Sequence, residues 1–499
     1  MDTSVTLVNP PYPKKAHQHP SFIPLGLAYL GAVLEKSGYS VNVIDCQAQK
    51  LTYIDLEHEI GKHEPRIVGI TSTTLTYKSA LKVAGIAKQV HPDCLTILGG
   101  CHATFWDGNA LEECPQLDMV ARKEGEITLL EIANRLKEKK PINDVLGTTF
   151  KEKGKIIRNA DRPFMEDLDS LPFPAHHLFP LRHLRTAGRI IFPLTTSRGC
   201  VYWCNFCTAV RMFGQKYRTR SPRNVVDEMQ FLNEKYGSSQ FTFSDDTFTV
   251  NQERTEKICE EIQNRNLKFE WDCETRVDMV TKDLLQKMKK AGCIAVWFGV
   301  ESGSQNVIDS MGKSFSIVQT RKAFKWANEV GLMTFAAVIL GFPSETKETA
   351  LKTVKFVEEL NPNDVGYHIA TPYPGTPMYD YVKENGWLKI TDFDRYDTAT
   401  PVVESPSLSM KDLAEIRERA YQRFYLRPSY FFRMLSKGGV YGISSAKTSF
   451  AWLLRALGVR LSCNSLSEIR RNKKRVFSVI VLTDCFESWV HAFDYWLYA

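Results

Sequence analysis

Three cysteines stand close together near the middle of the chain. In the run Cys200-Val-Tyr-Trp-Cys204-Asn-Phe-Cys207 they have the spacing C-x3-C-x2-C. Three thiolates on one short loop can ligate three corners of a [4Fe–4S] cube. The fourth iron then keeps an open position, which a catalytic metal site requires. The spacing therefore predicts a catalytic cluster with Cys200, Cys204 and Cys207 as its ligands.

The open iron indicates the chemistry. The amino and carboxylate groups of S-adenosylmethionine can chelate such an iron, and one electron from the cluster would then cleave the sulfonium to a 5′-deoxyadenosyl radical. A structural zinc site is the alternative. Structural zinc usually takes four ligands in two separated pairs, and the sequence holds no second C-x2-C. The cluster is therefore the favoured interpretation.

The composition is that of an ordinary soluble protein. Hydrophobic residues make up 43%, charged residues 24%, and the formal net charge is +7 over 499 residues. So small an excess does not favour a nucleic-acid partner. The start, Met1-Asp2-Thr3-Ser4, lacks the features of a secretion signal, and no apolar run is long enough to span a bilayer. We expect a cytoplasmic protein whose other cysteines stay reduced and mostly buried.

Short β-branched runs alternate with amphipathic segments over residues 1–140. Helical spacing of apolar residues over Gly26–Lys36 and Lys78–Val90 marks two of these segments. Such alternation predicts a doubly wound, Rossmann-like parallel sheet. The predicted strands are Val5–Val8, Val41–Ile44, Ile67–Ile70, Leu95–Leu98 and Met119–Ala121.

The residues that follow these strands are small, hydroxylated or glycine. Thr71-Ser72-Thr73 follows the third strand and Gly99-Gly100 follows the fourth. Ligands of doubly wound sheets bind at the carboxyl ends of the strands. Small residues there let the backbone approach a bulky, phosphate-bearing ligand.

A hairpin and a Pro-rich linker are expected over residues 141–188, followed by a second αβ series over 189–377. Six β/α units in that series favour an open, partial barrel of the TIM type, with its chemistry on the loops after the strands. Residues 378–499 are expected to form a helical, aromatic-rich region, including a helix over Met410–Phe424. The predicted barrel strands are Ile190–Thr195, Gln240–Ser244, Phe269–Cys273, Ile294–Gly299, Thr334–Leu340 and Val365–Thr371.

The cysteine motif and the later loops resemble the radical S-adenosylmethionine superfamily. Ser197-Arg198-Gly199-Cys200 through Cys207 has that family's signature, directly after the first barrel strand. Matching loops follow the next four strands in order. The resemblance implies a set of S-adenosylmethionine-binding residues on these loops: Asp245, Asp246, Glu274, Arg276, Glu301 and Ser302.

The N-terminal region resembles the cobalamin-binding domain that precedes this barrel in the cobalamin-dependent subgroup. The similar segments are Ile70-Thr71-Ser72, Leu98 through Thr104, and Arg122 through Glu126. The resemblance covers residues from about 5 to 435. It implies a cobalamin site formed by the strand-end residues Thr71, Ser72, Thr73, Gly99, Gly100, His102, Glu124 and Gly125.

The sequence departs from the family pattern at two places. The D-x-H-x-x-G signature, whose histidine ligates cobalt in other cobalamin proteins, is absent at Asp45-Cys46-Gln47. Cys101 replaces the proline that usually follows Gly-Gly. We therefore expect cobalamin to bind without a protein ligand to cobalt, with His102 as the residue that could overturn this expectation.

Two reactions follow from the subgroup. In the first, which we favour, a methyl group carried by cobalamin is transferred to an unactivated substrate carbon. In the second, as in the anaerobic Mg-protoporphyrin monomethyl ester cyclase and related enzymes of lipid tailoring, the substrate radical is oxidised or coupled instead. A third hypothesis is that the protein is not an enzyme but a carrier that binds a corrinoid or an iron–sulfur cluster. The expected partners are a small-molecule or lipid substrate and an electron donor such as ferredoxin or flavodoxin.

Overall fold

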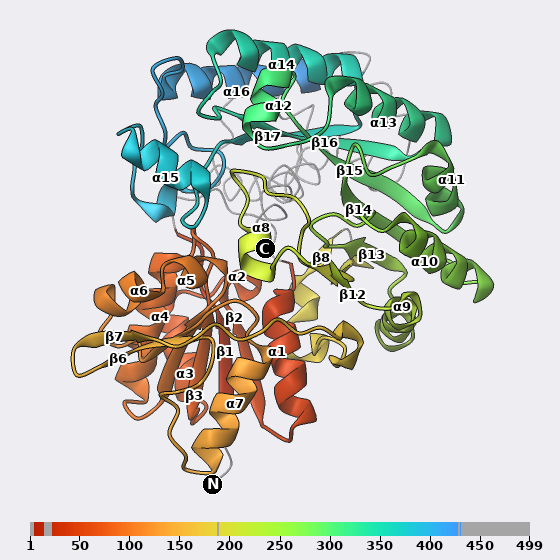
Figure 1. The fold of residues 1–499 in the computed structure, drawn as a ribbon. Coiled ribbons are helices and arrows are strands. Elements are labelled where there is room, and N and C mark those ends of the chain that lie inside the picture. Colours follow the sequence, from red (N-terminus) through yellow and green to blue (C-terminus); the bar gives the residue numbers. More distant parts are fainter. Residues whose placement is uncertain (1–3, 14–21, 187–188, 428–429, 431–499) are drawn as a thin grey trace, which may run out of the picture.

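The computed structural model describes residues 4–13, 22–186, 189–427 and 430. Two open sheets face each other across the chain's centre, with the short helix α8 (Ala209–Phe213) between them (Figure 1). No helix in the described residues is long and apolar enough to cross a membrane. The expected helical region at 378–499 can be judged only up to residue 430, since the rest lies outside the described residues.

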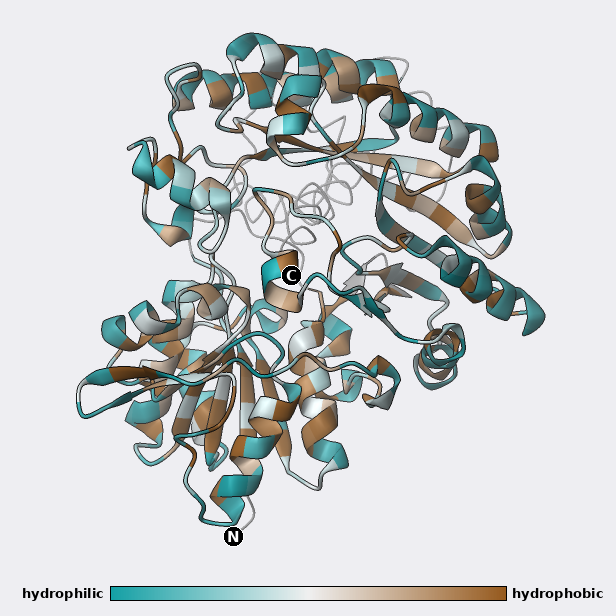
Figure 2. Ribbon diagram, in the orientation of Figure 1, coloured by the Kyte–Doolittle hydropathy of each residue, from teal (hydrophilic) through white to brown (hydrophobic). Residues whose placement is uncertain are grey.

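The N-terminal sheet has the strand order β2-β1-β3-β4-β5-β6-β7. Its first five strands are parallel, as the sequence predicts, and are almost entirely buried because helices cover both faces. Figure 2 shows these strands as the hydrophobic centre of that half. The strands are β1 (Val5–Asn9), β2 (Val41–Asp45), β3 (Ile67–Thr71), β4 (Leu95–Gly99), β5 (Met119–Ala121), β6 (Thr148–Glu152) and β7 (Lys155–Arg158).

The helices of this half follow its strands. They are α1 (Leu25–Lys36), α2 (Cys46–Gln49), α3 (Tyr53–Gly61), α4 (Tyr77–Val90), α5 (Cys101–Phe105), α6 (Asp107–Glu113) and α7 (Glu126–Lys137). The predicted hairpin is present as β6 and β7. It does not form a separate linker, because β6 pairs antiparallel with β5 and so extends the first sheet. A boundary at residue 140 therefore cuts through this sheet.

The second sheet has six parallel strands in sequence order, β10-β13-β14-β15-β16-β17, with its helices along the outer side (Figure 1). This is the predicted partial barrel. Its strands are β10 (Phe192–Leu194), β13 (Gln240–Phe243), β14 (Glu270–Arg276), β15 (Cys293–Glu301), β16 (Met333–Leu340) and β17 (Asp364–Ile369). Two small ladders accompany it: β8 (Arg185–Thr186) with β9 (Arg189–Ile190), and β11 (Ser197–Arg198) with β12 (Arg218–Thr219).

Caps set the helix boundaries in this half. Ser316 and Thr346 each begin a helix with a capping box, and Ser221 caps a helix whose first residue is Pro222. The helices are α9 (Pro222–Tyr236), α10 (Gln252–Asn264), α11 (Lys282–Lys290), α12 (Gln305–Ser310), α13 (Ile317–Val330), α14 (Lys347–Leu360), α15 (Pro377–Glu384) and α16 (Met410–Tyr425). Single 3-10 turns are η1 (Leu168–Ser170), η2 (His176–Leu178), η3 (Leu181–His183) and η4 (Phe393–Arg395).

Strands β14 and β15 run further than the sequence pattern predicts. Both continue at their carboxyl ends into polar residues, Glu274 to Arg276 in β14 and Glu301 in β15. The register shifts between Gly299 and Glu301, and Glu301 has a φ of 61°. Such irregularities re-aim a side chain at the end of a strand. These polar residues interrupt the hydrophobic pattern, so the sequence alone predicts strands that end too early. They are also the residues expected to bind a ligand.

Close packing of the loop after β15 against α14 gives the first prediction. A Cβ at Gly303 would lie 2.7 Å from Phe356 Cβ and 2.8 Å from the Lys352 carbonyl oxygen. We expect Gly303→Ala to lower the free energy of unfolding by about 1–3 kcal/mol, and with it the unfolding midpoint, because the backbone of α14 must move. Gly85→Ala is the matched control, since no atom lies within 4 Å of its added Cβ. It should stabilise α4. Equal midpoints for the two variants would contradict this packing.

Candidate active site

A cavity of about 290 Å³ lies between the two sheets, at the carboxyl ends of strands from both. In the N-terminal sheet it opens beside β1 and β3, where the strand order reverses, which is the place at which such sheets bind ligands. Most of the predicted cobalamin residues line it: Thr71, Ser72, Thr73, Gly99, Gly100, Glu124 and Gly125. The opposite wall comes from the second half of the chain and includes Ser197, Arg198, Thr208, Asp245 and Asp246.

The glycine pair after β4 gives this cavity a bare backbone wall. Gly100 has a φ of 96°, and a Cβ there would lie 2.5 Å from the Ser72 carbonyl oxygen and 2.8 Å from the Ser72 nitrogen. Only glycine fits this position. The Ser72 hydroxyl in turn donates to the Gly99 carbonyl at 3.1 Å, which fixes the loop. The absence of side chains at these two positions leaves room for a large ligand such as a corrinoid.

Buried ion pairs join the two halves beside the cavity. Arg198 donates to Glu126 at 2.6 Å and to Glu124 at 3.2 Å. Glu124 also pairs with Arg218 at 2.8 Å and accepts the Met165 N–H at 2.9 Å. Burial alone would raise the pKa of Glu126, but the charge of Arg198 outweighs it and the pKa lies below its usual value. The Glu126 carboxylate therefore stays ionised. Glu124 is committed to the protein rather than free for a ligand.

The three predicted cluster ligands lie on the loop between β11 and α8, next to this ion-pair network. Burial, the Asp246 charge and the neighbouring Cys204 raise the pKa of Cys200 to about 11. The Ala209 N–H donates to Cys207 Sγ at 3.4 Å. No three metal-binding side chains of the described residues already converge on one point. The donor set, three thiols on one short loop, is nevertheless the one that a [4Fe–4S] cluster requires.

Asp245 and Asp246 have different surroundings. The Asp245 carboxylate accepts hydrogen bonds from the N–H and hydroxyl groups of both Thr196 and Ser197, and so ties the end of β13 to the loop that leads to the cysteines. Asp246 has no such partners and is exposed in the cavity. Burial of the site and the Asp245 charge raise the pKa of Asp246 to about 6. Asp246 is the carboxylate available to a ligand's ammonium group.

The remaining predicted S-adenosylmethionine residues lie outside the cavity wall. Burial, together with the charges of Asp272, Asp246 and Glu301, raises the pKa of Glu274 well above its usual value. Glu301 pairs with Lys313 at 2.6 Å.

Two further residues brace the structure. Arg276 binds both oxygens of Asp278 at 2.9 Å and lies over the Tyr202 ring of the cluster loop. The Ser302 hydroxyl is bonded to Thr353 of α14 at 3.0 Å, so it is directed at the helical layer and away from the cavity.

His102 does not reach the main cavity. Its ring packs 4.3 Å from Tyr77 and 4.7 Å from Phe393, and Nδ1 is 3.1 Å from the Thr74 hydroxyl. Burial lowers the pKa of His102 to about 3, so the ring is neutral. Gln47, at the place of the missing D-x-H histidine, does line the cavity. This arrangement agrees with cobalamin bound without a histidine ligand, which stays a prediction.

The comparisons with known proteins agree with this geometry. The profile of the Radical SAM superfamily matches residues 194–357, and that of the B12 binding domain matches residues 18–133. The chain is 35% identical to an uncharacterized methyltransferase of Pyrococcus horikoshii over 82% of its own length and 89% of that protein. The chain belongs to the cobalamin-binding radical S-adenosylmethionine enzymes. Its cofactors are a [4Fe–4S] cluster, S-adenosylmethionine and cobalamin.

Other members of this family are similar over most of the chain. The anaerobic magnesium-protoporphyrin IX monomethyl ester cyclase of Cereibacter sphaeroides is 30% identical, over 82% of this chain and 68% of the cyclase. Among solved structures, the cobalamin-dependent S-adenosylmethionine radical enzyme OxsB, with aqua-cobalamin and S-adenosylmethionine bound, has a TM-score of 0.71 at 19% identity. It covers 94% of this chain, which in turn covers 71% of OxsB. The likeness to OxsB confirms the order of the two folds.

Three of the residues that join the halves, Arg198, Arg218 and Glu126, have no predicted role, whereas Glu124 is one of the predicted cobalamin residues. Arg198 and Glu126 stand inside quoted motifs, but their pairing spans 72 positions and no local pattern reveals it. Arg218, which pairs with Glu124, lies in no motif of its own. The only sequence feature that points to a role for Arg198 is its position two residues before Cys200.

Removal of single thiols tests the cluster assignment. Reconstituted anaerobically, the protein should bind about four irons per chain, and Cys200→Ala, Cys204→Ala or Cys207→Ala should each remove the cluster. Iron analysis with electron paramagnetic resonance measures this. Cys259→Ala is the matched control, since Cys259 is buried in α10, and it should keep its iron. Full iron loading in a variant that lacks all three thiols would refute the assignment.

The acidity of Asp246 gives a pH-dependent prediction. Because its pKa is raised to about 6, the carboxylate is charged above that pH and neutral below it. Affinity for S-adenosylmethionine should therefore fall as the pH falls through about 6. In Asp246→Asn it should be about tenfold weaker at neutral pH, with little pH dependence. Equilibrium dialysis measures this, with Asp283→Asn on α11 as the control and iron content as the check on the cluster. A parallel pH profile in Asp246→Asn would exclude this role.

Proposed function

We propose that this enzyme methylates an unactivated carbon of a small-molecule or lipid substrate. One observation supports this above all: a single cavity is lined by the glycine wall of the cobalamin-binding half and by Asp246 of the barrel. A methyl carrier and a source of substrate radicals would face each other there. The methyltransferase relative is consistent with this reaction.

When bound, the cluster supplies the electron that cleaves S-adenosylmethionine, and the corrinoid carries the methyl group. The chain's own residues bind, position and enclose these groups. Asp246 offers a carboxylate to the ammonium of S-adenosylmethionine, and the bare backbone at Gly99 and Gly100 receives the corrinoid. The Arg198 ion pairs hold the two walls in register, and the closed site limits quenching of a radical by water or solvent. An external donor such as ferredoxin or flavodoxin would deliver the electron.

A second candidate is oxidative cyclisation or coupling without methyl transfer. The specific observation in its favour is the 30% identity to the magnesium-protoporphyrin ester cyclase. The two reactions differ in their products. Methyl transfer turns one S-adenosylmethionine into S-adenosylhomocysteine, and hydrogen abstraction turns another into 5′-deoxyadenosine and methionine. Cyclisation yields 5′-deoxyadenosine and methionine alone.

Labelled S-adenosylmethionine distinguishes these reactions. Reconstituted enzyme, a strong reductant and CD3-labelled S-adenosylmethionine are incubated anaerobically with a small-molecule extract of cells that lack this protein. We expect comparable amounts of S-adenosylhomocysteine and 5′-deoxyadenosine, and a CD3 group in one class of metabolite by mass spectrometry. Release of 5′-deoxyadenosine with no labelled metabolite would contradict methyl transfer and favour cyclisation. The variant that lacks all three cluster cysteines is the control for background cleavage.

A further inference from the structure

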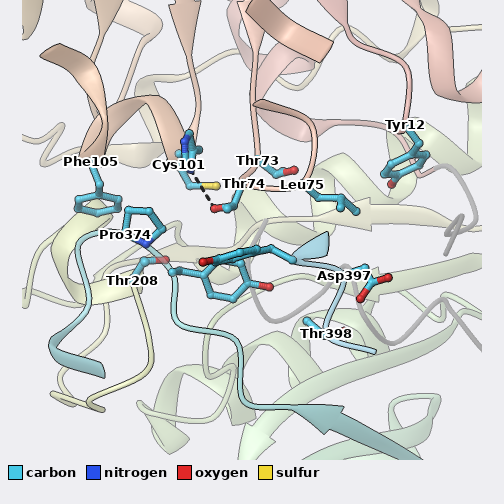
Figure 3. A pocket seen from close by; sticks show the side chains of 13 residues that line it. Tyr12, Thr73, Thr74, Leu75, Cys101, Phe105, Thr208, Pro374, Asp397 and Thr398 are labelled. Carbon is cyan, nitrogen blue, oxygen red and sulfur yellow. Dashed lines mark hydrogen bonds between the residues drawn. The ribbon is translucent and has the colours of Figure 1, made fainter. Parts of the chain in front are cut away.

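A second, smaller cavity adjoins the cofactor cavity. It has a volume of about 50 Å³, and Thr73, Cys101 and Thr208 line both cavities. Figure 3 shows Phe105, Thr74 and Tyr12, from the N-terminal half, opposite Pro374, Asp397 and Thr398, from the loops after β17. This cavity is much too small for a corrin. It has room for a few waters or one small ring of a molecule that extends from the main cavity.

Two residues of its wall each carry a buried polar atom that has no partner among the described residues. Thr398 is 3% exposed and its hydroxyl oxygen makes no hydrogen bond. His102 is 2% exposed, and while Nδ1 contacts the Thr74 hydroxyl, Nε2 has no partner. A buried polar group left unpaired is destabilising, so such groups usually mark the place of a water or ligand.

The backbone at Thr398 is held in an unfavourable conformation. Its φ is 55°, which is rare for a β-branched residue. The Thr398 carbonyl accepts the N–H of Ile369, at the end of β17, at 2.6 Å, and this bond helps to hold the turn. The neighbouring Asp397 carboxylate accepts the N–H groups of Ala399 and Thr400. The turn thus fixes Thr398, a wall residue with an unpaired hydroxyl, at a cost in strain, as ligand sites do.

The wall also indicates which chemistry it accepts. Its side chains include the aromatic rings of Phe105, Tyr373 and Tyr396 beside several threonines. No lysine or arginine is among the described residues that line it, and burial keeps His102 neutral by lowering its pKa to about 3. A phosphate or carboxylate would find no counter-charge among these described wall residues. An uncharged ring would find aromatic faces and a hydroxyl to bond with.

We propose that this cavity is a substrate subsite that takes an uncharged ring carrying one hydrogen-bonding group, read by the Thr398 hydroxyl. The inference rests on the proposed function, since the ring belongs to the molecule whose carbon reacts in the adjoining cavity. Thr398 then acts as a specificity-determining residue. Substrates with an anionic group at this end are excluded.

Small aromatic probes test the subsite without any turnover. Phenol, toluene and benzoate are titrated into the full-length, cluster- and cobalamin-loaded protein, and binding is followed by ligand-observed NMR. Phenol should bind more tightly than toluene, and benzoate should bind weakest. Because a net hydrogen bond is worth about 1 kcal/mol, Thr398→Val should weaken phenol about fivefold and leave toluene nearly unchanged.

Matched variants complete the experiment. Thr398→Ser keeps the hydroxyl and should keep the phenol affinity, whereas Thr391→Val, at an exposed site in the same connection, should change nothing. If Thr398→Val does not fold, Thr398→Gly removes the hydroxyl at a φ that glycine tolerates. Benzoate binding as well as phenol, or unchanged phenol affinity without the hydroxyl, overturns the proposal. Neither readout depends on S-adenosylmethionine cleavage, so failure of the proposed methyl transfer would be seen separately.

Discussion

Arg198 lies between the two sheets and donates to two carboxylates of the N-terminal half, Glu124 and Glu126. It is also two residues from Cys200, the first cysteine of the cluster loop. All three charged groups are buried, so they gain little stability over apolar residues, but removing one leaves an uncompensated charge at a cost of about 3–5 kcal/mol. Such a network has few acceptable geometries. It therefore fixes how the cluster loop sits relative to the cobalamin-binding half.

The remaining contacts of the site depend on that register. Asp245 uses its carboxylate to hold Thr196 and Ser197, the two residues before Arg198. Asp246, the residue after Asp245, is exposed to the cavity. On the opposite wall, Gly100 brings the backbone to a distance from Ser72 that no side chain allows. The shared cavity therefore has two differently built walls. On one wall the Gly100 backbone packs against Ser72, and on the other Asp245 is fixed by its hydrogen bonds.

The sequence predicts the local elements well where one physical signal dominates. The apolar runs predicted as strands of the first sheet are buried strands. It fails where several segments meet. The polar ends of β14 and β15 break the hydrophobic pattern, the hairpin joins a sheet whose edge is set elsewhere, and Ser302 faces α14 because of a strand irregularity. The subsite at Thr398 depends on a turn that only the folded chain reveals.

The central claim is that both halves of the chain face one cavity that receives the corrinoid. Hydrogen exchange of the full-length protein, with and without bound cobalamin, tests this most directly. Residues 69–73 and 97–101 of the N-terminal half line the cavity together with residues between 195 and 213 of the second half. Cobalamin should slow exchange on both sides at once. Protection confined to the N-terminal segments, or absent from both, would contradict the shared cavity.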